Sequence, residues 1–151
     1  MIRILASVAV ALFASTLCAQ RQVCKVVDGP VGCGPSLTAS FTSASKPAHR
    51  LRVDVSGLHT NSLGALVFGT QLLNPPVPVL PGSACFLLTD HYWSYVFSTG
   101  SNGRLRWETQ WPMSLQGAFF VQSGSLNLNS APEVPIDVKT SNVKITSCRL
   151  Q

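Results

Sequence analysis

Apolar and polar residues alternate strictly along the segment 49–56, which reads HRLRVDVS. Successive side chains of a β-strand point to opposite faces of a sheet, so this alternation predicts a strand with one buried face. The apolar set expected in the core is Leu51, Val53 and Val55, and the polar set expected in water is Arg50, Arg52 and Asp54.

The segment 104–110, RLRWETQ, repeats this pattern. Leu105 and Trp107 are predicted to point inward, whereas Arg104, Arg106, Glu108 and Gln110 are predicted to point outward. Glycine precedes this segment in the turn 100–103, GSNG. Asn-Gly beside alternating apolar residues is a strong signal for a β-hairpin. We therefore expect segments 92–98 and 104–110 to pair as a hairpin.

Further strands are expected where short runs rich in Val, Leu, Phe, Ser and Thr are bounded by Gly or Pro. These segments are 36–43, 63–69, 84–88, 92–98, 117–128 and 142–148. Trp93, Tyr95 and Phe97 are expected on one side of their strand. The sequence therefore predicts an all-β protein, an antiparallel β-sandwich of roughly eight strands with a jelly-roll-like arrangement.

Two proline-rich segments separate the predicted strands, 74–81 (NPPVPVLP) and 130–135 (SAPEVP). Proline cannot donate a backbone hydrogen bond to a neighbouring strand. We therefore expect the first segment to be an extended crossover loop and the second to be a shorter loop.

The N-terminal residues have the order of a secretory signal peptide. Arg3 precedes the uncharged apolar stretch 4–14, and small and polar residues follow it up to Ala19. This predicts a signal peptide over 1–19 that is cleaved after Ala19, a disulfide-containing segment over 20–35 and the sandwich domain over 36–151. No apolar run reaches the roughly 20 residues that cross a bilayer, so no transmembrane segment is expected. The protein is expected to be secreted or at the cell surface, or else periplasmic.

Cysteine usage fits that compartment. Removal of the signal peptide takes away Cys18 and leaves four cysteines, Cys24, Cys33, Cys85 and Cys148. Four cysteines allow three pairings, and the sequence does not choose among them. The turn-forming residues between Cys24 and Cys33 favour that pair, which leaves Cys85 with Cys148. A zinc site would need close C-x-x-C pairs, which the chain lacks, and no metal or other cofactor is predicted.

Charge adds only a weak indication of partners. The formal net charge of +5 becomes +4 without Arg3, which favours anionic polymers. The basic residues are scattered, so nucleic acid is not an expected partner. If the strands bearing Arg50 with Arg52 and Arg104 with Arg106 were neighbours, they would form a basic patch for an anionic cell-surface polymer, although ordinary solvated faces explain them more simply.

Catalytic patterns are absent from the sequence. There is no G-x-S-x-G, H-E-x-x-H, P-loop or EF-hand motif. His49, His59 and His91 are expected to be exposed at turns and strand ends. Asp54 or Asp90 could meet Glu108 across a cleft, as a glycosidase requires, but solvated surface positions are the simpler interpretation. A non-catalytic protein is therefore expected, with no catalytic or metal-binding residue, and a small extracellular hydrolase is the third hypothesis.

Aromatic residues supply the alternative binding hypothesis. Exposed Tyr92 and Trp111 could stack on sugar rings as in carbohydrate-binding modules, whereas Trp93 and Trp107 are expected in the core. An extracellular polysaccharide is the partner in this case.

Several short motifs occur in an order that resembles a group of uncharacterised secreted proteins and C-terminal modules of environmental bacteria, over 34–149. They are GCGP (32–35), LVFG (66–69), PGSAC (81–85), Gly103, WPMSLQG (111–117), FVQ (120–122) and SNVKI (141–145). The resemblance implies a secreted β-sandwich without a known activity. Together with the composition, it predicts a structural, adhesive or binding role, and self-association through edge strands is also open.

Overall fold

The computed structural model describes residues 22–43, 48–112, 116–128 and 136–150. The predicted signal peptide 1–19 with its cleavage site at Ala19, and the predicted loop 130–135, lie outside these ranges. Within them the chain forms antiparallel strands and no helix, so no helix there is long and apolar enough to cross a membrane. The strands are β1 (Gln22–Asp28), β2 (Ser36–Ser43), β3 (Ala48–Ser56), β4 (Leu63–Gly69), β5 (Leu72–Pro78), β6 (Phe86–Thr89), β7 (Trp93–Ser98), β8 (Arg104–Pro112), β9 (Gly117–Asn127), β10 (Asp137–Thr140) and β11 (Lys144–Leu150).

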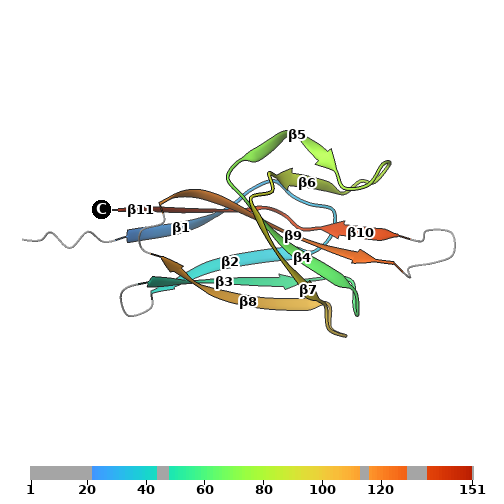
Figure 1. Cartoon of the computed structure of the whole chain (residues 1–151), viewed down its shortest axis with the longest axis horizontal. Helices are drawn as coiled ribbons and strands as arrows, with labels where there is room; N and C mark the ends of the chain where they lie inside the picture. The colour runs from blue at the N-terminus through green and yellow to red at the C-terminus, as the bar shows by residue number, and fades with distance from the viewer. Residues whose placement is uncertain (1–21, 44–47, 113–115, 129–135, 151) are drawn as a thin grey trace, which may run out of the picture.

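The strands form two packed sheets and a ribbon (Figure 1). The larger sheet has the order β1-β11-β9-β4-β7, with β10 paired to β9, and the smaller sheet has the order β2-β3-β8. β5 and β6 form a two-stranded ribbon on the side of the larger sheet that faces away from the smaller one (Figure 1). The predicted all-β antiparallel sandwich is confirmed. β1, β5 and β10 are additional to the strands expected from the sequence.

The core lies between the two sheets. Leu51, Val53 and Val55 of β3 are buried against Leu66 and Val121 of the larger sheet. Each such side chain contributes about 1.5–3 kcal/mol through the apolar surface that it removes from water. The predicted inner face of β3 is therefore confirmed. On β8, Leu105 and Trp107 pack against the same core and are partly buried, as expected.

The expected hairpin between β7 and β8 is not formed. β7 pairs with β4 in the larger sheet, whereas β8 pairs with β3 in the smaller sheet. A turn does form, because the amide of Gly103 donates to the carbonyl of Gly100 (3.1 Å). The amide of Leu58 then donates to the carbonyl of Gly103 (3.0 Å), so the turn is held by the loop after β3. These contacts direct the chain from one sheet to the other.

The proline-rich segment 74–81, expected to be a loop, contributes to strand β5. Leu72 pairs with Thr89 and Val77 with Leu87, and a bulge lies between these pairs. Pro75 and Pro76 fall within the bulge, where no ladder hydrogen bond is needed from their missing N–H groups. The prediction was wrong because an edge strand with a bulge tolerates proline.

The four cysteines form two disulfides, but not in the favoured pairing. Cys24 of β1 is bonded to Cys148, its cross-strand partner on β11, and Cys33 is bonded to Cys85. The turn-forming residues between Cys24 and Cys33 do not fold the chain back on itself. Instead, the amide of Gly29 donates to Val143 (2.9 Å) and that of Cys33 to Thr140 (2.9 Å), so this segment runs along the link between β10 and β11. Two disulfides indicate an oxidising compartment.

A buried glutamine holds the ribbon to the larger sheet. Gln122 of β9 is fully buried, and its Oε1 accepts the amide of Leu88 (2.9 Å). Its Nε2 donates to the carbonyl of Phe86 (2.9 Å) and to that of Ser141 (3.2 Å). One side chain therefore bonds to β6 in the way that a neighbouring strand would. The Cys33–Cys85 disulfide, next to β6, adds a covalent link to the same region.

Candidate functional site

Three aromatic rings meet where the two sheets end on the same side of the sandwich. Trp93 and Tyr95 project from β7, the last strand of the larger sheet, and Trp107 projects from β8, the last strand of the smaller sheet. The ring centroid of Trp107 lies 6.0 Å from that of Trp93 and 6.1 Å from that of Tyr95. We call these three residues the aromatic patch.

The aromatic patch is supported from below and open above. Buried Phe68 contacts Trp93 and Trp107, with ring centroids 4.8 Å and 5.3 Å away. Trp93 retains 46 % of its surface exposed and Tyr95 retains 39 %. Trp93 was expected in the core, because alternation places it on the inner face of β7. That placement is correct, but β7 is at the edge and the smaller sheet does not extend over the ring.

Hydrogen bonds hold the turn that leads into β7 and the aromatic patch. Asp90 accepts hydrogen bonds at Oδ1 from the amides of Thr70 (2.6 Å) and Gln71 (2.9 Å). The bond from Gln71 is the main reason that the pKa of Asp90 lies below its ordinary value. Desolvation opposes this effect, and hydrogen bonds from Thr70 and Thr89 lower the pKa further. Tyr92 follows, and its amide donates to the carbonyl of Phe68 (2.9 Å). Its side chain is exposed, as predicted.

Trp111, the other ring predicted to be exposed, is buried. Only 7 % of its surface is accessible, and its ring lies between Phe41 (5.9 Å) and Phe119 (5.1 Å). The residue continues the inner-face alternation of β8 to the end of the strand, so its side chain points into the core. Trp111 therefore cannot stack on an external ligand, and its assignment to a sugar site was wrong.

The four arginines that would form a basic patch if their strands were neighbours do lie on one sheet face. β3 and β8 are neighbours, and cross-strand pairing sets Arg52 opposite Glu108 and Asp54 opposite Arg106. Glu108 bonds Arg52 (2.6 Å) and Arg50 (3.4 Å). The arginines thus share their face with two acids, and the positive field is correspondingly reduced.

The remaining arginines complete this face. Arg106 donates from Nε to Asp54 (2.7 Å), and this hydrogen bond and charge hold the pKa of Arg106 above its ordinary value. Arg104 is exposed at the start of β8. Such exposed pairs contribute little to stability, because solvent screens the charges. The face is accordingly a solvated, ion-paired surface rather than a concentrated basic site.

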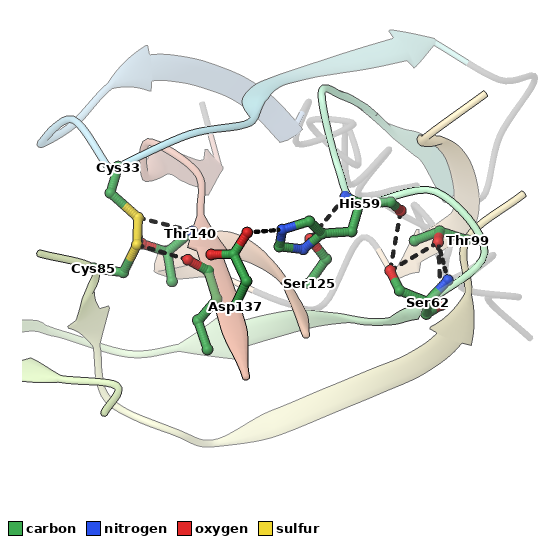
Figure 2. A network of polar contacts seen from close by, with 9 residues as sticks. Cys33, His59, Ser62, Cys85, Thr99, Ser125, Asp137 and Thr140 are labelled. Carbon is green, nitrogen blue, oxygen red and sulfur yellow. Dashed lines mark hydrogen bonds and ion pairs between the residues drawn. A yellow bond between two sulfur atoms is a disulfide. The ribbon is translucent and has the colours of Figure 1, made fainter. Parts of the chain in front are cut away.

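A serine, a histidine and an aspartate form a chain of hydrogen bonds that the sequence did not indicate (Figure 2). Nε2 of His59 lies 2.7 Å from Asp137 Oδ2, and Nδ1 lies 3.0 Å from Ser125 Oγ. His59 is buried, so its prediction as an exposed turn residue was wrong. Ser125 lies 66 positions and Asp137 lies 78 positions after His59 in the sequence, so only the fold brings the three residues together.

This chain of hydrogen bonds lacks an accessible nucleophile. Ser125 is only 4 % exposed, and its Oγ also accepts the amide of His59 (3.1 Å). Only Asp137 reaches solvent to a large extent. A substrate would have to reach the serine, not the carboxylate, for nucleophilic catalysis. The arrangement instead secures the loop after β3 to β9 and β10.

Other groups with catalytic or metal-binding potential are dispersed. Nε2 of His49 lies 3.1 Å from the carbonyl oxygen of Gln22, and His91 is exposed in the turn before β7. In the part of the chain that the structure describes, no three His, Cys, Asp or Glu side chains gather closely enough to hold a metal ion.

An apolar groove of about 320 Å³ lies between the ribbon and the outer face of the larger sheet. Its walls include Leu63, Val67 and Val96 from the sheet, with Val79 and Leu87 from the ribbon region. None of the described residues that line it is charged. A polar polymer would find few partners there, so the aromatic patch is the better candidate site.

Comparisons with protein-family models, with curated proteins and with solved structures find no match for this chain. The resemblance to secreted β-sandwich proteins of environmental bacteria stays a prediction.

Proposed function

We propose that this chain is a non-catalytic exported protein that binds an extracellular polysaccharide through the aromatic patch. The observation that carries the proposal is the contiguous aromatic surface of Trp93, Tyr95 and Trp107, in which Trp93 and Tyr95 are exposed and Trp107 is partly buried. Scattered exposed apolar residues are common on proteins, but rings in mutual contact at an open edge form a continuous apolar surface. Such a surface suits the apolar faces of sugar rings.

The geometry of the patch favours a ligand that lies across it. The ring planes of Trp93 and Trp107 are inclined by 44° and those of Tyr95 and Trp107 by 40°, so the three rings offer faces of different orientation to a ligand. Exposed Tyr92 directly precedes Trp93 in the chain, and its hydroxyl group can exchange hydrogen bonds with a sugar hydroxyl. A chain of sugar units could therefore contact several rings in succession.

Export is part of the proposal. Both disulfides require an oxidising environment to persist, which favours a periplasmic or extracellular site. The signal-peptide pattern of residues 1–19 points in the same direction. An adhesive or matrix role follows naturally for a protein that binds a polymer outside the cell.

The experiment is retention of the disulfide-bonded protein on insoluble polysaccharides, followed by titration with soluble oligosaccharides of any polymer that retains it. Trp93→Ala and Tyr95→Ala are expected to weaken binding at least tenfold, because each removes a stacking surface. Phe86→Ala is the matched control, since Phe86 is an aromatic residue on the ribbon with the same 39 % exposure as Tyr95. Binding should also shift the tryptophan emission to shorter wavelength as water leaves Trp93.

Two outcomes would contradict the proposal. One is the absence of retention on every polysaccharide tested, including cellulose, chitin, xylan and peptidoglycan. The other is retention that Trp93→Ala and Tyr95→Ala reduce no more than Phe86→Ala does.

A further inference from the structure

Most edge strands among the described residues carry features that oppose pairing with other chains along at least part of their length. An unprotected edge offers a row of unpaired amide and carbonyl groups to any other strand. Charged side chains occupy three edge or short strands, namely β1 with Lys25 and Asp28, β8 with Arg104, Arg106 and Glu108, and β10 with Asp137 and Lys139. Proline removes donors from β5.

Carboxamide side chains occupy part of two further edges. Asn142 accepts the amide of Leu37 at Oδ1 (2.9 Å) and donates from Nδ2 to the Leu37 carbonyl (3.2 Å), which occupies both groups of one residue on β2. Gln122 does the same on β6, where it bonds Leu88 and Phe86. Each carboxamide takes the place of a neighbouring strand only at the residues that it bonds.

β7 has none of these devices. Its sequence is WSYVFS, with no charge, no proline and no glycine, and its register with β4 contains no bulge. Val96 is 65 % exposed on one face of the strand, and Trp93 and Tyr95 are partly exposed on the other. A short uncharged segment of high β-propensity at an edge is the type of strand that pairs with another chain.

The backbone groups available on β7 follow from its pairing with β4. The amide of Thr99 donates to the carbonyl of Ser62 (2.8 Å), so Thr99 points toward β4. Alternate residues of an antiparallel strand point to opposite neighbours. Ser94, Val96 and Ser98 therefore direct their amide and carbonyl groups to the outer edge, where no other strand among the described residues pairs with them.

We propose that β7 pairs antiparallel with β7 of a second copy of this chain, about a two-fold axis at Val96. This register sets Val96 opposite Val96 of the partner subunit and Ser94 opposite Ser98 of the partner subunit. The outward amide and carbonyl groups of all three residues then form hydrogen bonds with the partner strand. Tyr95 then lies opposite Phe97 of the partner subunit, an aromatic cross-strand pair. A symmetric pairing of identical strands closes after two copies. The proposal does not depend on sugar binding.

The test is the concentration dependence of the mass of the disulfide-bonded protein, measured by sedimentation velocity. The wild-type protein is expected to form a dimer. Val96→Lys is expected to weaken the dimer at least tenfold, because it sets two ammonium groups opposite each other at the axis. Val27→Lys is the matched control, since Val27 is 53 % exposed on β1, the other edge of the same sheet, and its dimer should be unchanged.

A second measurement reports the register. Amide exchange at Ser94, Val96 and Ser98 should slow as the protein concentration rises, while exchange at control sites on β1 stays constant. A monomer at all concentrations up to about 1 mM would overturn the proposal. So would a dimer that Val96→Lys and Val27→Lys affect equally, or one without protection at the three outward amides.

Discussion

Gln122 provides the sharpest test of how the ribbon is held on the larger sheet. The substitution Gln122→Leu retains a side chain of similar size but removes every polar atom. The amide of Leu88 then loses its acceptor, and the carbonyls of Phe86 and Ser141 lose a donor. Since two of the three bonds are to the ribbon, its attachment should weaken more than the sandwich does.

The expected magnitude follows from the number of bonds. A hydrogen bond contributes about 1 kcal/mol to stability, and a buried partner left unsatisfied costs about 1–3 kcal/mol. Three lost bonds at a fully buried position, partly offset by the added apolar burial of leucine, should lower the free energy of unfolding by about 3 kcal/mol. Such a loss is a large fraction of the about 5–15 kcal/mol typical of a domain.

Urea unfolding with both disulfides intact, followed by tryptophan fluorescence, measures this loss. The matched control is Gln110→Leu, because Gln110 is exposed on β8 and the same substitution there should change the free energy by less than about 0.5 kcal/mol. Amide exchange at Leu88 should accelerate in Gln122→Leu. A free energy within about 1 kcal/mol of wild type, with unchanged exchange at Leu88, would refute the assignment of Gln122 as the polar link to the ribbon.

Three further outcomes are expected. Replacement of Cys33 and Cys85 together by alanine should destabilise the protein by up to about 4 kcal/mol, since that bond closes a loop of 52 residues, and calorimetry measures the loss. Asp90→Asn should reduce acid sensitivity: the Gln71 amide lowers the pKa of Asp90 from 3.8, so the associated stability is present above that pH and is lost as the pH falls below it, which urea midpoints at pH 6 and pH 2.5 would show. Trp111→Ala should cost about 3–5 kcal/mol in urea unfolding, but Trp111→Phe markedly less, because the buried indole N–H has no partner among the described residues.

Local alternation was sufficient to predict the buried and exposed faces of β3. Leu51, Val53 and Val55 differ so clearly from their neighbours that a shift of one residue would expose all of them. The same period would have predicted the burial of Trp111, since it lies on the face of β8 that carries Leu105 and Trp107. Trp111 was instead predicted to be exposed, and this interpretation was wrong.

Long-range pairing was not predictable from local signals. The disulfide partner of Cys24 is set by the register of β1 on β11, 124 residues away, and not by the turn-formers beside it. The Asn-Gly turn at 102–103 was identified, but the strands that it joins belong to different sheets because contacts from Leu58 hold the turn.

In the candidate site, too, local alternation was predictable and long-range contacts were not. Trp93 and Tyr95 were placed on one face of their strand, whereas their partial exposure depends on β7 being an edge. His59 has no neighbouring sequence signal for burial, since its partners Ser125 and Asp137 arrive from distant strands.

The bond between Cys24 and Cys148 has a mechanical consequence. Gln22 and Leu150 are cross-strand partners, so the chain enters and leaves the described fold at one point, with the disulfide two residues inside it. A pull applied to both ends would otherwise peel β1 from β11 one residue at a time. With the bond in place, the tension passes through two sulfur atoms, and the strands between Cys24 and Cys148 carry no load until a reductant cuts the bond.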